Sequence, residues 1–165
     1  MSLQSFEKIY DLRPRDARLL GVDFGMRRIG VAVSNIQQDM ATSVATIKRS
    51  SFDRDIRALK EIIEDYEAKG IIFGWPLNMD GSEGSMCERV RSFADELSKR
   101  PEIMGDEPWM AWVDERLSTQ SVDEFLVKSV DMSRTKRKQV IDKLAAQKIL
   151  QTAIDRLPSL ERRRE

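Results

Sequence analysis

Short apolar runs alternate with segments of helical periodicity along most of the chain. Two runs near the start, Leu19–Asp23 and Ile29–Ser34, flank a glycine-containing turn and predict a β-hairpin. The β-branched segment Ser43–Ile47 predicts a third strand beside them. Two later runs, Ile71–Gly74 and Trp109–Val113, are continuously apolar, as is typical of buried parallel strands. The five runs therefore predict a sheet that begins with antiparallel strands and continues with parallel ones.

Four segments between and after these runs carry apolar residues at the spacing of an α-helix. They are Phe52–Lys69, Ser85–Lys99, Ser118–Val130 and Arg134–Leu157. We expect Gly70 to end the first of these helices and Pro158 to close the last. Because strands alternate with helices, the pattern predicts an α/β fold, with a mixed sheet flanked by helices.

The remaining segments predict little regular structure. Residues 1–18 read as a lead-in with a short helix before Pro14, and residues 158–165 as a flexible tail. The loop Trp75–Ser85 is rich in turn residues, which predicts a mobile connection. The chain shows no internal repeat or linker, and 165 residues suffice for one hydrophobic core. We therefore expect a single domain over residues 1–165.

The amino-acid composition limits the kinds of catalytic site that the chain can form. Lys plus Arg and Asp plus Glu number 28 each, so net charge gives no argument for or against a polyanionic partner. The chain contains no histidine, which excludes a Ser-His-Asp triad and a histidine-ligated zinc site. If the protein is an enzyme, then carboxylates, Lys, Tyr or a hard metal ion must do the work.

The expected location is the cytoplasm. The single cysteine, Cys87, excludes an intramolecular disulfide and suits a reducing compartment. No apolar run approaches the roughly 20 residues of a membrane-spanning helix, so no membrane partner is expected. The N-terminus is charged and lacks the apolar segment of a signal peptide.

Carboxylates end two of the predicted strands. Asp23 closes the first run, and Asp114 and Glu115 follow the last one. Asp142 lies in the longest predicted helix, with two alanines one turn further on. Small residues on that face would let the helix lie close to the sheet, so Asp142 would face the sheet edge rather than open water.

Carboxylates that meet repel one another and raise each other's pKa values, and divalent cations relieve this repulsion. For an all-oxygen site without histidine, Mg²⁺ or Mn²⁺ is the natural ion. Two such ions about 4 Å apart clamp the attacking water and the leaving oxygen of a phosphodiester. Alternatives stay open, because each acid alone can form a turn or cap a helix, and Asp142 can pair with Lys138.

Four motifs, DFGMRRIGVAVSN, FGWPLNMDGSEG, DERLSTQSV and IDKLAAQKILQ, resemble the YqgF/RuvX family of Holliday-junction-resolvase-like proteins, also described as pre-16S rRNA nucleases. The resemblance implies an RNase H-like fold, a bacterial cytoplasmic setting and metal-dependent phosphodiester hydrolysis. It places the family's catalytic and metal-binding acids on Asp23, Glu115 and Asp142. Phe24 stands where a proline is common, and Asn35 where an aspartate is common; neither replaces one of the three acids.

Basic residues stand next to each acid motif and are candidate phosphate contacts. They are Arg27, Arg28, Arg116, Arg134, Lys136, Arg137 and Lys138. Cations at the start of a helix oppose its dipole, and a bound phosphate would offset that cost. The alternatives are a solvated basic surface and, for Arg116, a pair with an acid.

The loop supplies one more candidate contact to nucleic acid, Asn78. The alternative for the loop is a connector in which Ser82 or Ser85 caps the helix that follows.

The leading hypothesis is a nuclease with Mg²⁺ or Mn²⁺ that processes the 5′ end of pre-16S ribosomal RNA, as the resemblance implies. One alternative is a Holliday junction resolvase acting on branched DNA. Another is a non-catalytic nucleic-acid-binding module in transcription or ribosome assembly. A nucleotide-binding phosphotransferase is a further option, for which the chain leaves little room. Monomer and homodimer both remain open.

Overall fold

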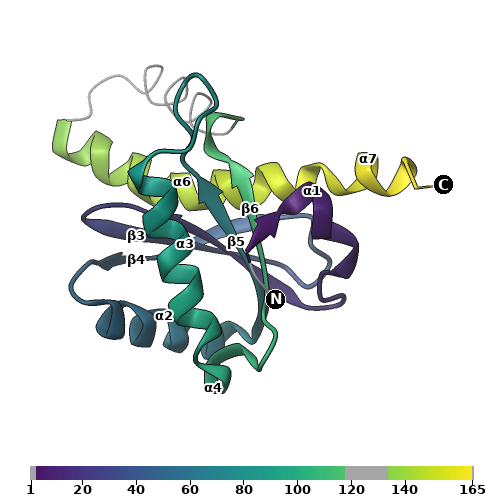
Figure 1. The fold of residues 1–165 in the computed structure, drawn as a ribbon, viewed down its shortest axis with the longest axis horizontal. Coiled ribbons are helices and arrows are strands. Elements are labelled where there is room, and N and C mark those ends of the chain that lie inside the picture. The colour runs from purple at the N-terminus through teal and green to yellow at the C-terminus, as the bar shows by residue number, and fades with distance from the viewer. Residues whose placement is uncertain (1–2, 118–133, 165) are drawn as a thin grey trace.

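The computed structural model describes residues 3–117 and 134–164, with side chains in the first turns of the last long helix described only for Lys136 and from residue 144 onward. A six-stranded sheet forms its centre, in the order β1-β6-β5-β2-β3-β4 (Figure 1). The strands are β1 Gln4–Ser5, β2 Arg18–Phe24, β3 Arg28–Ser34, β4 Ala41–Lys48, β5 Ala68–Trp75 and β6 Trp109–Asp114.

The pairing of the strands confirms the predicted mixed sheet. β2 pairs antiparallel with β3, and β3 antiparallel with β4. β5 lies between β2 and β6 and is parallel to both. The carboxyl ends of β2, β5 and β6 therefore meet at one edge of the sheet, which is where ligands bind in sheets of this kind.

Helices cover both faces of the sheet. Those described are α1 Phe6–Ile9, α2 Phe52–Tyr66, α3 Ser85–Ser98, α4 Pro101–Met104, α6 Arg134–Asp155 and α7 Leu157–Arg162, with 3₁₀ turns at Tyr10–Leu12 and Glu115–Leu117. Figure 1 shows α2 and α3 on one face and α6 crossing the other. The helix expected over Ser118–Val130 lies outside the described residues. No described helix combines the length and the apolar character that crossing a membrane requires.

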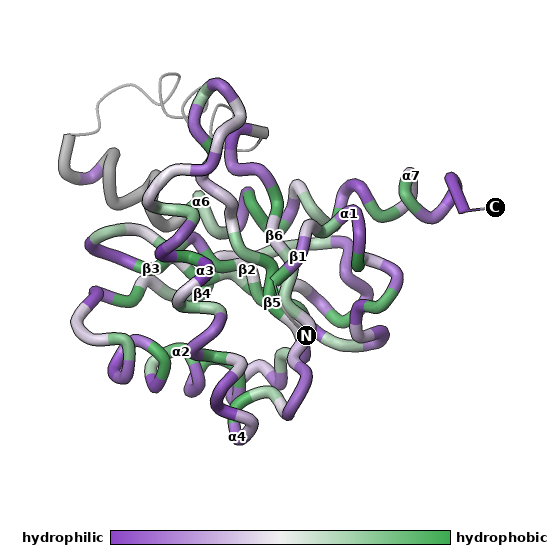
Figure 2. The backbone as a smooth tube through the Cα atoms, viewed as in Figure 1, coloured by the Kyte–Doolittle hydropathy of each residue, from purple (hydrophilic) through white to green (hydrophobic). Residues whose placement is uncertain are grey.

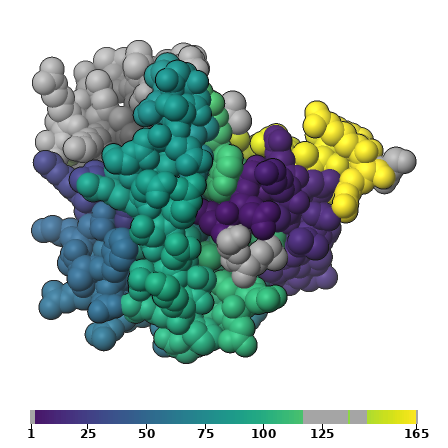
Figure 3. Space-filling view, in the orientation of Figure 1, coloured from purple at the N-terminus to yellow at the C-terminus, as the bar shows by residue number. Residues whose placement is uncertain are grey.

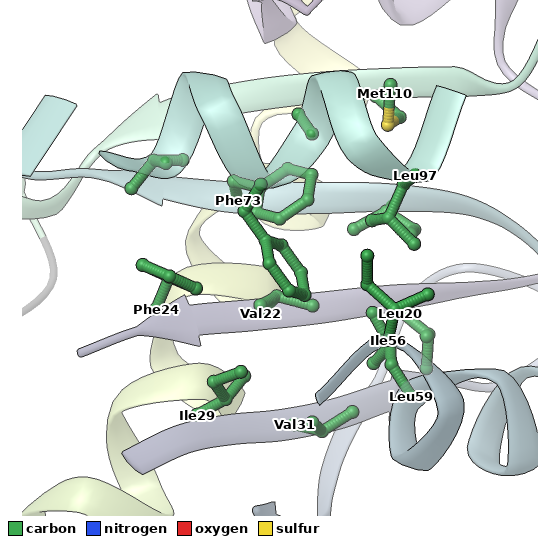
Figure 4. Packing of buried hydrophobic residues seen from close by; sticks show 14 of the residues in the cluster. Leu20, Val22, Phe24, Ile29, Val31, Ile56, Leu59, Phe73, Leu97 and Met110 are labelled. Atoms are coloured by element: carbon green, nitrogen blue, oxygen red, sulfur yellow. The ribbon is translucent and has the colours of Figure 1, made fainter. Parts of the chain in front are cut away.

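Two apolar clusters hold these layers together. One lies between the sheet and helices α2 and α3, where Val22, Phe73 and Ile56 are fully buried (Figure 4). The other lies under α6 and α1 and includes Ile72 and Leu150. Figure 2 shows the resulting pattern, with hydrophobic strands inside and hydrophilic residues along the outer surfaces of the helices.

Helix α6 lies unusually close to the sheet. A Cβ atom added to Gly21 of β2 would stand 2.6 Å from Leu150 Cβ and 2.9 Å from the Ala146 carbonyl oxygen, so only glycine fits there. The Gln147 and Gln151 side chains accept hydrogen bonds from backbone N–H groups of β4. The close approach expected from the small residues of this helix is therefore confirmed, and α6 runs opposite in direction to β4 and β2.

Gly70 does not end helix α2. The helix stops at Tyr66, and Glu67 takes the left-handed conformation with φ 54° and ψ 41°. Gly70 instead lies inside β5, where an added Cβ would stand 2.7 Å from the Trp109 ring. The glycine makes room for an aromatic side chain of the neighbouring strand, and this is why the helix-end prediction is wrong.

The first and the last described segments are both built into the fold. β1 pairs with β6, and Phe6 and Tyr10 are buried beneath α7 and β6. Pro158 stands in the first turn of α7, a position that suits proline, rather than closing α6. The buried Arg13 donates to Glu161 at 2.8 Å, and the Tyr10 hydroxyl donates to the Leu160 carbonyl at 3.0 Å. The prediction of a flexible tail is therefore wrong for residues 158–162.

Replacing Leu160 by alanine should lower the free energy of unfolding by about 2 kcal/mol, because the side chain is 7% exposed and its loss leaves a cavity. Urea denaturation followed by circular dichroism measures this change. Arg163→Ala, at an exposed position of the same segment, is the matched control and should change stability little. Equal stability of the Leu160 variant and the wild type would show that α7 contributes nothing to the core.

Candidate active site

Asp23 and Glu115 come together at the carboxyl edge of the sheet. Asp23 is the sixth residue of β2, and Glu115 directly follows β6. β5 separates the two strands, so the acids reach across its last residues. Both side chains are half-buried. The prediction that these strand ends bring acids to one place is confirmed for this pair.

Gly74 of β5 makes the meeting possible. A Cβ atom there would overlap with the Glu115 carboxyl oxygen Oε1 and lie 2.5 Å from Ile149 Cδ1. The Glu115 side chain therefore lies directly over the Gly74 backbone, under helix α6. Sequence reasoning missed this role, although a glycine within an apolar strand often marks such a close approach.

The pKa of Glu115 rises to about 9, first because the carboxyl is buried and then because of the Asp23 charge and a hydrogen bond with Asp23. Asp114 adds a smaller repulsion. At neutral pH Glu115 therefore keeps its proton, and a hydrogen bond joins it to Asp23. A half-buried pair of carboxyl groups, all oxygen donors, fits a hard divalent cation.

Asp142 lies in α6, and its side chain is outside the described part of the structure. Its backbone position precedes Ala146, which lies over Gly21, by one helical turn. Among the described residues, no group of three or more cysteine or acidic side chains gathers in metal-binding fashion. The third acid therefore stays a prediction.

Arg116 is paired with an acid, which is the alternative to a phosphate contact given above for this residue. Its guanidinium forms a fork with the Asp114 carboxylate, with Nε at 3.0 Å from both oxygens and Nη2 at 2.7 Å from Oδ2. This pairing holds the pKa of Asp114 below its usual range. Nη1 donates to the Met79 carbonyl at 3.3 Å. Arg116 thus connects the end of β6 to the loop that follows β5.

That loop is internally hydrogen-bonded. The Asn78 amide donates to the Ser82 hydroxyl at 3.0 Å, and the Ser82 hydroxyl donates to Asp80 at 2.6 Å. The alternative in which Ser82 or Ser85 caps α3 is wrong, because Gly84 is the N-cap residue and no side chain caps it. Asn78 is exposed, and nucleic-acid contact by its side chain stays a prediction.

The other predicted phosphate contacts divide by position. Arg27 and Arg28 lie in and beside the turn between β2 and β3, directly after Asp23, with Arg27 exposed and Arg28 half-buried. Lys136 is exposed on the first turn of α6. The side chains of Arg134, Arg137 and Lys138 lie outside the described part.

Arg49 supports the turn beside Asp23, a role that sequence reasoning also missed. Its side chain donates to the Gly25 carbonyl at 3.2 Å and pairs with the buried Asp55 at 3.3 Å. The guanidinium lies 4.4 Å from the centre of the Phe24 ring. An arginine 26 positions after Asp23 carries no signal in the sequence, because only the antiparallel pairing of β3 with β4 brings it back to this turn.

The comparisons with known proteins bear directly on this site. The family model for RuvX, described as Holliday junction resolvase, matches residues 17–156. The chain belongs to the RuvX family. A relative from Rhodospirillum centenum, named "Putative pre-16S rRNA nuclease", is 41% identical over 157 residues, which cover 95% of this chain and 83% of that protein. One of the same name from Caldanaerobacter subterraneus is 44% identical over 138 residues, covering 84% and 96%.

Two solved structures of resolvases share the fold of this RuvX family member. The structure of T. thermophilus RuvC in complex with Holliday junction substrate superimposes with a TM-score of 0.54 at 12% identity, covering 87% of this chain and 97% of that one. The yeast mitochondrial Holliday junction resolvase Ydc2 gives 0.54 at 11% identity, covering 96% and 87%. At these identities the likeness concerns the fold, and it confirms the predicted RNase H-like sheet. Family membership confirms the predicted nuclease class.

Without divalent cations, the unfolding free energy should fall as pH rises from about 5 to 9. In this window the folded protein keeps the Glu115 proton, whose pKa is about 9, while the unfolded chain releases it near 4.5. Glu115→Gln removes this loss, so the variant should unfold a few degrees above the wild type at pH 8 and close to it at pH 5. Thermal unfolding in chelator at both pH values measures the difference. An unchanged gap between the two proteins from pH 5 to pH 8 would contradict the raised pKa.

Proposed function

We propose that this protein is a metal-dependent nuclease that hydrolyses phosphodiester bonds of precursor ribosomal RNA in the cytoplasm, at the 5′ end of pre-16S rRNA. The observation that carries the proposal is the half-buried pair Asp23 and Glu115, two carboxyl groups that a hydrogen bond joins at the carboxyl edge of the sheet. Such an arrangement costs stability in a resting protein, and it is the arrangement expected where a cation binds.

In this proposal Asp23, Glu115 and Asp142 hold Mg²⁺ or Mn²⁺. The backbone geometry supports Asp142 as the third ligand. Ala146 lies over Gly21, and α6 runs in the direction opposite to β2. Going back one helical turn from Ala146 to Asp142 therefore leads toward the same edge of the sheet as going forward from Gly21 to Asp23. When bound, two ions would neutralise the acids and activate water for in-line attack on phosphorus. The protein's own part is rigid placement: Gly74 and Ile149 fix Glu115, and the paired strand β2 fixes Asp23.

Cationic side chains around these acids would hold the phosphates. Arg27 and Arg28 lie on the β2–β3 turn, and the basic residues 134–138 open helix α6, toward the same edge. Arg116 is a weaker candidate, because its guanidinium is largely satisfied by Asp114 and the loop carbonyls. We propose that it positions the loop rather than the phosphate.

The names of the relatives, pre-16S rRNA nucleases, favour precursor rRNA as the substrate. A second candidate, cleavage of a branched DNA, is favoured by the description of the family model and by the shared fold of a resolvase bound to a Holliday junction. Both substrates present phosphates to the same acids, so the geometry near Asp23 does not choose between them.

Asp23→Asn should abolish metal-dependent cleavage while leaving the fold intact, because the amide keeps the shape of the side chain and loses its charge. End-labelled precursor rRNA and a four-way DNA junction would be incubated with Mn²⁺, with Mg²⁺ and with chelator. The variant purified in parallel controls for contaminating nuclease. Cleavage by the variant at the wild-type rate would refute the acid site, and the better-cut nucleic acid identifies the substrate class.

Mn²⁺ should bind the wild-type protein and raise its melting temperature by several degrees, since ligands that bind only the folded state stabilise it. Glu115→Gln should lose both the calorimetric heat and the stabilisation. Glu102→Gln, an exposed acid on the short helix α4, serves as the matched control and should keep both. Absence of heat and stabilisation in the wild type would favour the non-catalytic binding module.

A further inference from the structure

A cavity of about 250 Å³ opens at the outer edge of the sheet, beyond the carboxyl end of β6. β1 pairs with β6 only at Ala111 and Trp112 before the chain turns into α1, which leaves the space open. Its walls include Ser5, Phe6, Leu77, Trp112, Asp114 and Arg156. In Figure 3 the purple N-terminal segment and the teal segment that contains the loop lie on either side of the green end of β6.

We propose that this pocket receives one unstacked nucleobase of the nucleic-acid substrate. The inference rests on the proposed nuclease function and adds a place where the substrate is held away from the reacting phosphate. The cavity is smaller than the ~300–1,000 Å³ of sites for drug-sized ligands, so it suits a single planar group.

An aromatic column ends in the pocket. Trp75 and Trp112 stack with ring centroids 5.2 Å apart and an interplanar angle of 23°. Trp75 is 1% exposed, and the Arg91 guanidinium lies over its ring, 5.1 Å from the centroid. Trp112 is half-buried and lines the cavity. A base placed on Trp112 would extend the column by one ring, and such stacking accepts any base.

The polar groups of the pocket are already held in place. Arg156 is paired with Glu7 of α1, and Asp114 is held by the Arg116 fork. The Ser5 hydroxyl adds a group that both donates and accepts. An apolar floor with a few fixed polar groups is the composition of a small-ligand site, and binding there needs little reordering of side chains.

The pocket also lies within reach of a strand bound at the acids. Asp114 pairs in register with Trp75 of β5, and β5 separates β6 from β2. Two strand spacings therefore separate Asp114 from the strand that carries Asp23, about 10 Å. About three stacked nucleotides cover this distance. The base in the pocket would thus belong to a nucleotide a few positions from the scissile phosphate.

The test uses a 12-nucleotide single-stranded RNA with 2-aminopurine at one position, in a series that moves the probe along the strand. The protein is Asp23→Asn, so that the RNA is bound and not cut. Because 2-aminopurine fluorescence falls on stacking, we expect strong quenching at one position. Trp112→Leu should relieve that quenching and weaken binding about tenfold, whereas Trp112→Phe should retain both.

A second variant guards against misfolding of the first. Ser5→Leu adds bulk to the wall and leaves Trp112 in place, so it should also relieve the quenching. Met40→Ala, at an exposed apolar residue of the β3–β4 turn, is the control and should change nothing. Each variant's melting temperature shows that it is folded.

Quenching that is uniform along the RNA, or that survives both Trp112→Leu and Ser5→Leu, would overturn the inference. Failure to bind the RNA would overturn it as well. If the wild type cleaves RNA but the quenching does not depend on Trp112, the nuclease function is supported and the base-binding pocket is refuted. If the quenching depends on Trp112 but no substrate is cleaved, the base-binding pocket is supported and the proposed hydrolysis is refuted.

Discussion

The site depends on two carboxyl groups that the fold holds together at the end of a buried sheet. Asp23 and Glu115 approach closely enough to form a hydrogen bond, although each would be more stable apart in water. What forces them together is packing: β5 is threaded between their strands, and α6 presses Glu115 against the backbone of Gly74. The apolar clusters on both faces of the sheet supply the free energy that outweighs the repulsion.

At three places in the sheet, a group from a neighbouring element comes close to the strand backbone because the strand residue there is a glycine without a side chain. Gly21 lets α6 lie on β2, Gly70 admits the Trp109 ring, and Gly74 admits the Glu115 carboxyl. Each of the three lies in a strand, where glycine weakens pairing. Gly21 and Gly74 bring a helix and an acid nearer to the sheet than ordinary side chains allow, whereas Gly70 makes room for an aromatic ring near the start of β5.

The sequence predicted the larger elements well because buried strands and amphipathic helices leave long periodic signals. The strands β2 to β6 and the helices α2, α3 and α6 appear within a few residues of the expected bounds. The sequence did not predict β1 and α7, because these elements, with two and six residues, are too short to show a periodic pattern. Their place is fixed by distant partners, such as Glu161 for Arg13. In the site, the strand-end acids were visible in sequence, whereas Gly74 and Arg49 act through neighbours that only the folded sheet provides.

The burial of α7 against α1 joins the last residues of the chain to the first ones. The ion pair of Arg13 with Glu161 adds a polar contact between the same two segments. Loss of α7 would therefore loosen α1 as well, so two segments that lie 150 positions apart in the sequence should unfold together as one cooperative unit.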